Sequence, residues 1–165
     1  MNVFEKMLKI KNLIFDIDGV FTDGSVLLTP DGDLLRTMNS KDGFSIRKAV
    51  DVGLNVVFIS GGDSESIKLR FEKLGVKHIY LAVSDKLSKF NELSEKYGFK
   101  ADESLYMGDD ILDLDLLKNV LLPVCPSDAA HEVVEICDYI TEKPGGKACV
   151  REIVEKVLTI QNKWV

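Results

Sequence analysis

Short apolar runs alternate with segments of helical spacing along most of the chain. The apolar runs lie at residues 13–17, 56–60, 78–83, 105–108 and 121–124, and they are typical of buried parallel strands. Apolar residues three and four positions apart predict helices at 45–52, 64–74, 86–97, 112–118, 129–136 and 148–160. This alternation predicts an α/β fold built on a doubly wound (Rossmann-like) parallel sheet.

One segment after the first predicted strand departs from this alternation. Residues 25–29 and 34–38 flank Pro30-Asp31-Gly32-Asp33, a turn sequence typical of hairpins. We therefore predict a β-hairpin over about residues 25–38 that protrudes from the sheet. Its apolar residues do not alternate with polar ones, so its leucines are exposed unless another subunit covers them. Packing of the hairpin onto its own subunit is the alternative.

The composition indicates one soluble domain. A chain of 165 residues with 45% hydrophobic residues is long enough for one well-buried core, so we predict a single domain over 1–165 with a tail at about 144–165. The 27 acidic and 21 basic residues give a net charge of -6 without a basic cluster, which argues against nucleic-acid and membrane partners. No apolar run approaches the ~20 residues of a membrane span and no signal-peptide pattern is present, so we expect a cytoplasmic protein.

The three cysteines match neither a disulfide framework nor a CxxC metal site. They are odd in number, and eleven residues separate each from the next: Cys125, Cys137 and Cys149. We expect them to be buried free thiols.

Polar residues follow four of the predicted strands. They are Asp16-Ile17-Asp18, Ser60-Gly61, Lys86, and Gly108-Asp109-Asp110 with Asp113 beyond. Because doubly wound topology brings the carboxyl ends of the strands together, we expect these side chains to share one crevice. Side chains one residue apart in an extended segment point the same way, so Asp16 and Asp18 are expected to crowd each other unless a cation stands beside them.

These residue types suit phosphoryl transfer. A carboxylate that attacks a phosphate dianion meets a repulsion of roughly 4 kcal/mol per unit-charge pair, at a separation of about 4 Å and an effective dielectric constant of about 20. Mg²⁺ removes this obstacle, and Asp16, the backbone carbonyl of Asp18, and Asp109 can supply the oxygen ligands that it prefers. Asp16 is then the nucleophile that forms an aspartyl-phosphate, while Asp18 protonates the leaving alkoxide and later activates water.

The phosphoryl oxygens also need hydrogen-bond donors and positive charge. The Ser60 hydroxyl, the neighbouring backbone N–H of Gly61 and the Lys86 ammonium are predicted to hold them. Each element alone has an ordinary structural explanation, since the aspartates can form turns or helix caps and Lys86 can be a solvated lysine. Their order and their joint position at strand ends favour a catalytic site.

At these residues the chain resembles the haloacid dehalogenase superfamily of phosphohydrolases, whose four motifs are a DxD, a Ser or Thr, a Lys and an acidic GDD-like segment. More narrowly, it is similar to the 3-deoxy-D-manno-octulosonate 8-phosphate phosphatases at residues 16–24, 41–43, 84–86, 108–110 and 145–152. The resemblance implies a fold without a cap domain, a homotetramer formed through the hairpin, and Mg²⁺ as the cofactor. It also implies that a phosphorylated sugar acid releases phosphate in lipopolysaccharide sugar biosynthesis.

One position departs from that family pattern. Gly62 stands where these phosphatases usually carry Arg, so a nonulosonic acid 9-phosphate is an alternative substrate. Arg70 and Lys73 match positions that in relatives meet the substrate carboxylate from a neighbouring subunit, and Lys147 follows a glycine pair that can close over the site. The resemblance thus implies substrate-binding roles for Arg70, Lys73 and Lys147, with solvated surface side chains as the alternative.

Two other function classes share parts of this pattern. A signalling receiver also forms a phospho-aspartate, but it places the acceptor after the third strand and has no late Gly-Asp-Asp segment. A non-catalytic assembly module keeps the fold and the hairpin, yet it has no need for both Asp16 and Asp18. We therefore expect a phosphoric monoester hydrolase.

Overall fold

The computed structural model describes all 165 residues. Its centre is a six-stranded parallel sheet in the order β5-β4-β1-β6-β7-β8, which confirms the doubly wound α/β fold. The strands are β1 (Asn12–Phe15), β4 (Asn55–Ile59), β5 (His78–Tyr80), β6 (Ser104–Met107), β7 (Leu122–Cys125) and β8 (Tyr139–Ile140). After β1, the strands β4 and β5 lie on one side of it, and the later strands β6, β7 and β8 lie on the other side. The strand order therefore switches direction at β1.

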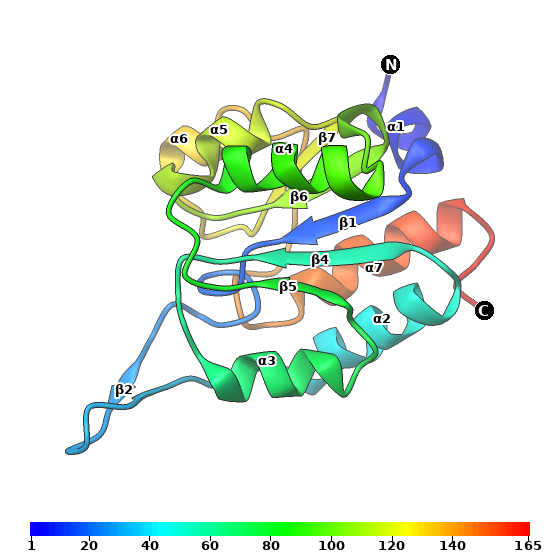
Figure 1. Ribbon diagram of the computed structural model, residues 1–165. Coiled ribbons are helices and arrows are strands. Elements are labelled where there is room, and N and C mark those ends of the chain that lie inside the picture. Colours follow the sequence, from blue (N-terminus) through cyan, green and yellow to red (C-terminus); the bar gives the residue numbers. More distant parts are fainter.

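Helices cover both faces of the sheet (Figure 1). One face carries α4 (Lys86–Tyr97), α5 (Leu114–Leu117) and α6 (His131–Val134), and the other carries α2 (Ser40–Asp51), α3 (Glu65–Glu72) and α7 (Cys149–Ile160). Within β1, Leu13 and Phe15 join the apolar cluster of the second face, and Ile14 joins that of the first. Alternate side chains of a strand point to opposite faces, so β1 is buried on both sides, as its continuous apolar run predicts.

Several element boundaries differ from the prediction. The helix α2 begins at Ser40 instead of residue 45, because the Asn39 side chain accepts a hydrogen bond from the N–H of Lys41 at 3.0 Å and caps the helix. Gly43 obscures this first turn in the sequence, since glycine disfavours helices. The predicted helix at 112–118 is a 3₁₀ turn, η2 (Ile111–Asp113), followed by the short α5. The sequence pattern also misses α1 (Val3–Lys9), the short β8 and the 3₁₀ turn η1 (Ala101–Glu103).

The predicted hairpin is present and projects away from the body of the molecule (Figure 1). It pairs β2 (Leu27–Leu28) with β3 (Leu34–Leu35), so that Leu27 lies opposite Leu35 and Leu28 opposite Leu34. The first two leucines are 67% and 71% exposed, and the other two are 49% exposed. Leu34 and Leu35 of β3 border a cavity of about 240 Å³ together with Ile67 and Arg70 of α3, so the β3 side of the hairpin lies beside its own subunit. The leucines of β2 stay largely exposed, so packing onto its own subunit does not cover the whole ribbon.

The buried Asp42 caps α7 from a neighbouring helix. Its Oδ1 accepts a hydrogen bond from the N–H of Arg151 at 2.7 Å, whereas Ala148 at the N-cap position of α7 has no side chain that can do so. The other oxygen, Oδ2, has no hydrogen-bond partner. Burial raises the pKa of Asp42 to about 6, although the Arg151 N–H and the charge of Lys143 lower it in part.

This burial predicts a pH dependence of stability that Asp42→Asn removes. A carboxyl whose pKa rises on folding from 3.8 to about 6 makes the folded state bind more protons in that range, so stability falls as the pH rises through it. Relative to Asp42→Asn, the wild type should lose up to about 3 kcal/mol of unfolding free energy between about pH 4 and about pH 7. Urea unfolding across this range measures the difference, with the exposed Asp51→Asn as a control on the same helix. If the unfolding free energies of wild type and Asp42→Asn changed with pH in the same way, this prediction would be contradicted.

Two further sequence expectations concern the whole chain. None of the helices is both long enough and apolar enough to cross a membrane. The three cysteines are free thiols, of which Cys125 and Cys149 are buried as predicted and Cys137 is half-buried.

Candidate active site

The loop after β1 brings Asp16 to the carboxyl edge of the sheet. The N–H of Asp16 still donates to the carbonyl oxygen of Met107 on β6 at 2.9 Å, and the chain then turns out of the strand. Gly19 has a φ of +81°, and a Cβ there would lie 1.9 Å from Oδ2 of Asp109. Only glycine fits this turn, because the left-handed conformation and the close approach both exclude a side chain.

Asp16 and Asp113 share the ammonium group of Lys86. The Lys86 Nζ lies 2.8 Å from Oδ2 of Asp16 and 2.6 Å from Oδ1 of Asp113, and the three side chains are 5%, 11% and 1% exposed. Burial and the charge of Asp113 raise the pKa of Asp16 to about 6, although Lys86 lowers it in part. Burial lowers the pKa of Lys86, but the two carboxylates outweigh burial and raise it above its ordinary value. Lys86 is therefore a fixed positive charge beside Asp16.

Asp113 holds the acidic loop after β6 in place. Its Oδ1 also accepts a hydrogen bond from the hydroxyl of Tyr106, and its Oδ2 accepts the N–H groups of Asp109 at 2.9 Å and Asp110 at 3.2 Å. A Cβ on Gly108 would lie 2.5 Å from Cγ of Asp113, so glycine allows the loop to wrap this closely. With both oxygens engaged, Asp113 orients Lys86 and the Asp109 loop.

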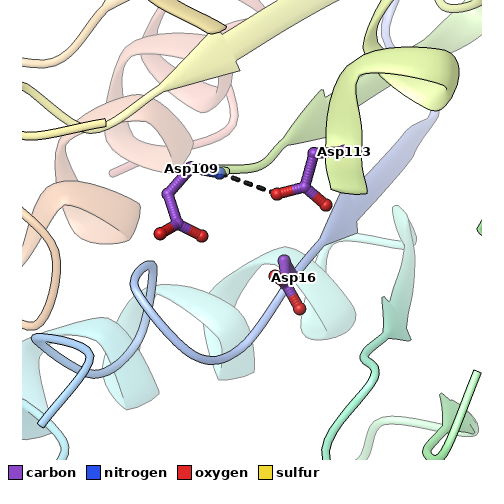
Figure 2. Close-up of side chains that lie close together, drawn as sticks. All are labelled: Asp16, Asp109 and Asp113. Carbon is purple, nitrogen blue, oxygen red and sulfur yellow. Dashed lines mark hydrogen bonds between the residues drawn. The ribbon is translucent and has the colours of Figure 1, made fainter. Parts of the chain in front are cut away.

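Asp16, Asp109 and Asp113 together form an acidic cluster that fits a divalent cation. One oxygen from each lies within 4.8 Å of the others. Figure 2 shows the three side chains close together, with Asp16 after β1, Asp109 in the loop after β6 and Asp113 on the helical turn that follows. Burial and the charges of Asp16 and Asp113 raise the pKa of Asp109 to about 8. The side-chain oxygens of Asp109 accept no hydrogen bond within the protein, so they are free to bind a cation. A cation there would offset the repulsion between the negative charges of Asp16, Asp109 and Asp113.

Asp18 has a positive partner of its own. Its Oδ1 accepts hydrogen bonds from Nε of Arg36 at 2.7 Å and from the hydroxyl of Thr22 at 3.3 Å. The expectation that an extended segment holds Asp16 and Asp18 side by side is wrong, because β1 ends at Phe15 and the chain turns immediately afterwards. The two carboxylates border the same cavity, but Asp16 pairs with Lys86 and Asp18 pairs with Arg36.

The segment after β4 supplies hydrogen-bond donors at the same edge. Ser60 is buried, and its Oγ accepts the N–H of Gly62 at 3.3 Å. The N–H groups of Gly61 and Asp18 donate to no acceptor within the protein. Backbone N–H groups that point into an open site bind anionic oxygens, so this edge can hold a phosphoryl group.

The strand ends surround a single cavity of about 730 Å³. Three of its 15 lining residues are hydrophobic, which suits a hydrophilic ligand of the size of a sugar phosphate. The cavity brings together all the predicted catalytic, phosphate-binding and metal-binding residues: Asp16, Asp18, Ser60, Gly61, Lys86 and Asp109.

The three predicted substrate-binding residues lie outside this cavity within one subunit. Arg70 and Lys73 are exposed at the end of α3, and Arg70 borders a separate cavity of about 240 Å³ beside the hairpin. Lys147 is exposed as well. Hydrogen bonds from Ser25 lower the pKa of Asp23 most, and the charge of Lys147 lowers it further.

The glycine pair before Lys147 packs tightly against the Asp16 loop. The N–H of Gly146 donates to the carbonyl oxygen of Val20 at 3.0 Å, and that of Gly145 donates to Oδ1 of Asp128 at 2.8 Å. A Cβ on Gly145 would lie 2.0 Å from the carbonyl oxygen of Gly19. The pair thus supports the loop that carries Asp16.

Arg36 and Tyr106 belong to this site although the sequence gives no sign of it. Arg36 follows β3 in the hairpin, and Tyr106 lies in the middle of β6, where an aromatic residue is ordinary core. Asp113 is visible as an acidic residue beyond Gly108-Asp109-Asp110, but its role depends on contacts with Lys86 and Tyr106 that spacing alone does not reveal.

Comparison with known proteins places this site in a family. A model of haloacid dehalogenase-like hydrolases matches residues 78–149. The 3-deoxy-D-manno-octulosonate 8-phosphate phosphatase KdsC of Escherichia coli K12 is 34% identical over 162 residues, which are 98% of this chain and 86% of the relative.

Solved structures agree with this relationship. The 3-deoxy-D-manno-octulosonate 8-phosphate phosphatase of Yersinia pestis superposes with a TM-score of 0.95 at 31% identity, over 98% of this chain and 88% of the other. The corresponding phosphatase of Moraxella catarrhalis, in complex with magnesium ion, phosphate ion and KDO, superposes with a TM-score of 0.94 at 28% identity, over 98% and 92% of the two chains. This chain therefore belongs to the KdsC family of phosphatases, within the haloacid dehalogenase-like hydrolases.

Proposed function

We propose that this protein hydrolyses 3-deoxy-D-manno-octulosonate 8-phosphate to the free sugar acid and inorganic phosphate, as a step of lipopolysaccharide sugar biosynthesis. The observation that carries the proposal is the convergence of Asp16, Lys86 and Asp109 in a polar cavity of a KdsC-family fold. The cavity volume and its polar lining suit a sugar-acid phosphate.

Each residue of the cavity has a separate role in the proposed reaction. A carboxylate oxygen of Asp16 attacks phosphorus, the bond to the sugar oxygen breaks, and Asp18 gives that oxygen a proton. Asp18 then takes a proton from water, which attacks the aspartyl-phosphate and releases phosphate. The Ser60 hydroxyl, the free Gly61 N–H and Lys86 hold the phosphoryl oxygens.

Mg²⁺ is the cofactor that we propose for this site, with Asp16, the backbone carbonyl of Asp18 and Asp109 as its ligands. It supplies the positive charge that allows a carboxylate to approach a phosphate dianion. Lys86 alone does not balance the carboxylates that line the cavity, since Asp110 and Asp113 border it as well.

A phosphate-release screen tests the proposed function. The purified protein is assayed with Mg²⁺ against 3-deoxy-D-manno-octulosonate 8-phosphate, a nonulosonic acid 9-phosphate and neutral sugar phosphates. We expect the highest kcat/KM with the first substrate. A preference for the 9-phosphate would assign the alternative substrate, and the absence of phosphate release from every compound would leave a non-catalytic module.

Asp109→Asn should weaken Mg²⁺ binding at least about tenfold, because it replaces a charged ligand by a neutral one. Two readouts measure this, the Mg²⁺ concentration for half-maximal phosphate release and the dependence of the melting temperature on Mg²⁺. Asp115→Asn, an exposed carboxylate on α5, is the control. An unchanged Mg²⁺ dependence in both readouts would remove Asp109 from the metal site.

We also propose that the protein is a homotetramer assembled through the hairpin. The four hairpin leucines are between 49% and 71% exposed, and they form an apolar surface that a monomer would leave largely in water. Arg70, Lys73 and Lys147 keep their proposed substrate-binding roles, either in the site of their own subunit or in that of a neighbour, and these roles stay predictions. The cytoplasmic location stays a prediction as well.

The double substitution Leu27→Asp and Leu35→Asp should reduce the assembly to a smaller species. The two residues lie opposite each other on one face of the ribbon, and burying each leucine stabilises an interface by roughly 1.5–3 kcal/mol. Sedimentation velocity measures the change. Leu8→Asp is the control, because Leu8 is also exposed but lies on α1, away from the hairpin (Figure 1). Identical sedimentation of the wild type and the double variant would refute assembly through this face.

A further inference from the structure

Arg36 follows β3 of the hairpin and reaches Asp18, which lines the active-site cavity. Arg36 itself borders the separate cavity of about 240 Å³ beside the hairpin. Its side chain is 8% exposed, although its neighbour Leu35 is 49% exposed. The guanidinium is held at two points, since Nε donates to Oδ1 of Asp18 at 2.7 Å and Nη1 donates to the carbonyl oxygen of Leu34 at 2.9 Å. Such a charge-assisted pair fixes the geometry of the carboxylate as well as that of the arginine.

This contact makes the two oxygens of Asp18 different from each other. Oδ1 is engaged by Arg36 and by the Thr22 hydroxyl, whereas Oδ2 accepts no hydrogen bond. A Cβ on Gly62 would lie 3.1 Å from Oδ2 of Asp18 and 3.5 Å from Nη2 of Arg36. Because Gly62 has no side chain, it leaves room for the Asp18 carboxylate and the Arg36 guanidinium. Gly62 lines the cavity, so Oδ2 is the oxygen of Asp18 that lies on the cavity side.

We propose that Arg36 positions Asp18 for proton transfer to the leaving group, an inference that depends on the proposed function. By holding Oδ1, Arg36 keeps Oδ2 as the oxygen that carries the proton. The proton passes from Oδ2 to the sugar oxygen as the bond between that oxygen and phosphorus breaks. Arg36 keeps its own protons throughout, because a guanidinium is not deprotonated in proteins. It is a positioning residue, and it links the acid/base group to the hairpin.

The experiment compares Arg36→Met and Arg36→Lys with wild type on three phosphate esters. These are 3-deoxy-D-manno-octulosonate 8-phosphate, a neutral hexose 6-phosphate, and p-nitrophenyl phosphate, whose leaving group departs without a proton. We expect Arg36→Met to lower kcat/KM by about 10- to 100-fold for both alkyl esters and to change the aryl ester little. For the sugar acid, kcat should fall more than KM changes, and Arg36→Lys should recover part of the loss.

A second arm uses Asp18→Asn, which already lacks the acid. Adding Arg36→Met to it should cause no further loss, because the two residues act as one unit. Arg47→Met, which removes an exposed arginine paired with Asp51 on α2, is the control and should match wild type.

Three results would overturn the inference. They are an equal loss on all three esters, a loss confined to the sugar acid, and additive losses in the double variant. A loss confined to the sugar acid would make Arg36 a ligand of the substrate carboxylate. Because wild type is assayed alongside, its failure to release phosphate from any ester would instead contradict the proposed function.

Discussion

Asp16→Asn is expected to lower kcat by on the order of 10⁴-fold or more, because it removes the nucleophile while leaving the cavity intact. An amide nitrogen or oxygen does not form the covalent phospho-intermediate, and residual turnover would have to come from binding and the remaining charges alone. Phosphate release under saturating substrate and Mg²⁺ measures the loss. Full activity in this variant would contradict the nucleophilic role of Asp16.

The same variant should fold at least as well as wild type. Burial and the neighbouring Asp113 raise the pKa of Asp16 to about 6, so the charged form is costly in the folded protein and Asn removes that cost. Lys86 keeps its contact with Asp113 at 2.6 Å. A melting temperature equal to or above that of wild type would show that Asp16→Asn loses activity without losing its folded structure. Asp23→Asn, an exposed carboxylate in the same loop, is the control for activity.

Lys86→Met is expected to cost about 3–5 kcal/mol of unfolding free energy and to abolish turnover. Methionine fills a similar volume, but it leaves the carboxylates of Asp16 and Asp113 buried without the cation that both contact. The pKa of Asp16 should then rise further, because Lys86 is the group that lowers it. Urea unfolding in the absence of Mg²⁺ measures the stability, and phosphate release measures the activity.

Lys89→Met is the matched control on the same helix. Lys89 pairs with Glu92 at the surface, and its side chain is 26% exposed, so its removal should cost less than about 1 kcal/mol. If Mg²⁺ binds the acidic cluster, it should restore part of the stability of Lys86→Met by replacing the missing charge. An unfolding free energy of Lys86→Met equal to that of wild type would show that the buried carboxylates do not depend on Lys86.

The fold could be predicted largely from the spacing of apolar residues. The helix α4 has the predicted bounds, because Asp85 caps it at one end and Gly98, with a φ of +75°, ends it at the other. Short elements were harder to predict. The strand β8 has only two residues, and it is defined by pairing with β7 rather than by a pattern of its own.

The strand-end positions of the site could also be predicted, since chain order determines which loops follow parallel strands. The individual contacts could not. Asp18 and Arg36 are 18 positions apart, and their pairing depends on how the hairpin leaves the sheet. The same holds for Asp113, whose distance from Lys86 is set by the packing of α4 and α5 rather than by sequence spacing.

The contact between Gly146 and Val20 has a consequence for how the enzyme is made. These residues are far apart in the sequence, yet the N–H of Gly146 donates to the carbonyl oxygen of Val20 at 3.0 Å. Contacts of such large sequence separation form late in folding because the chain must first close a long loop. During synthesis on the ribosome, the nucleophile loop gains this support only after Gly146 has emerged. A nascent chain can therefore contain all four motifs before Gly145 and Gly146 pack against its Asp16 loop.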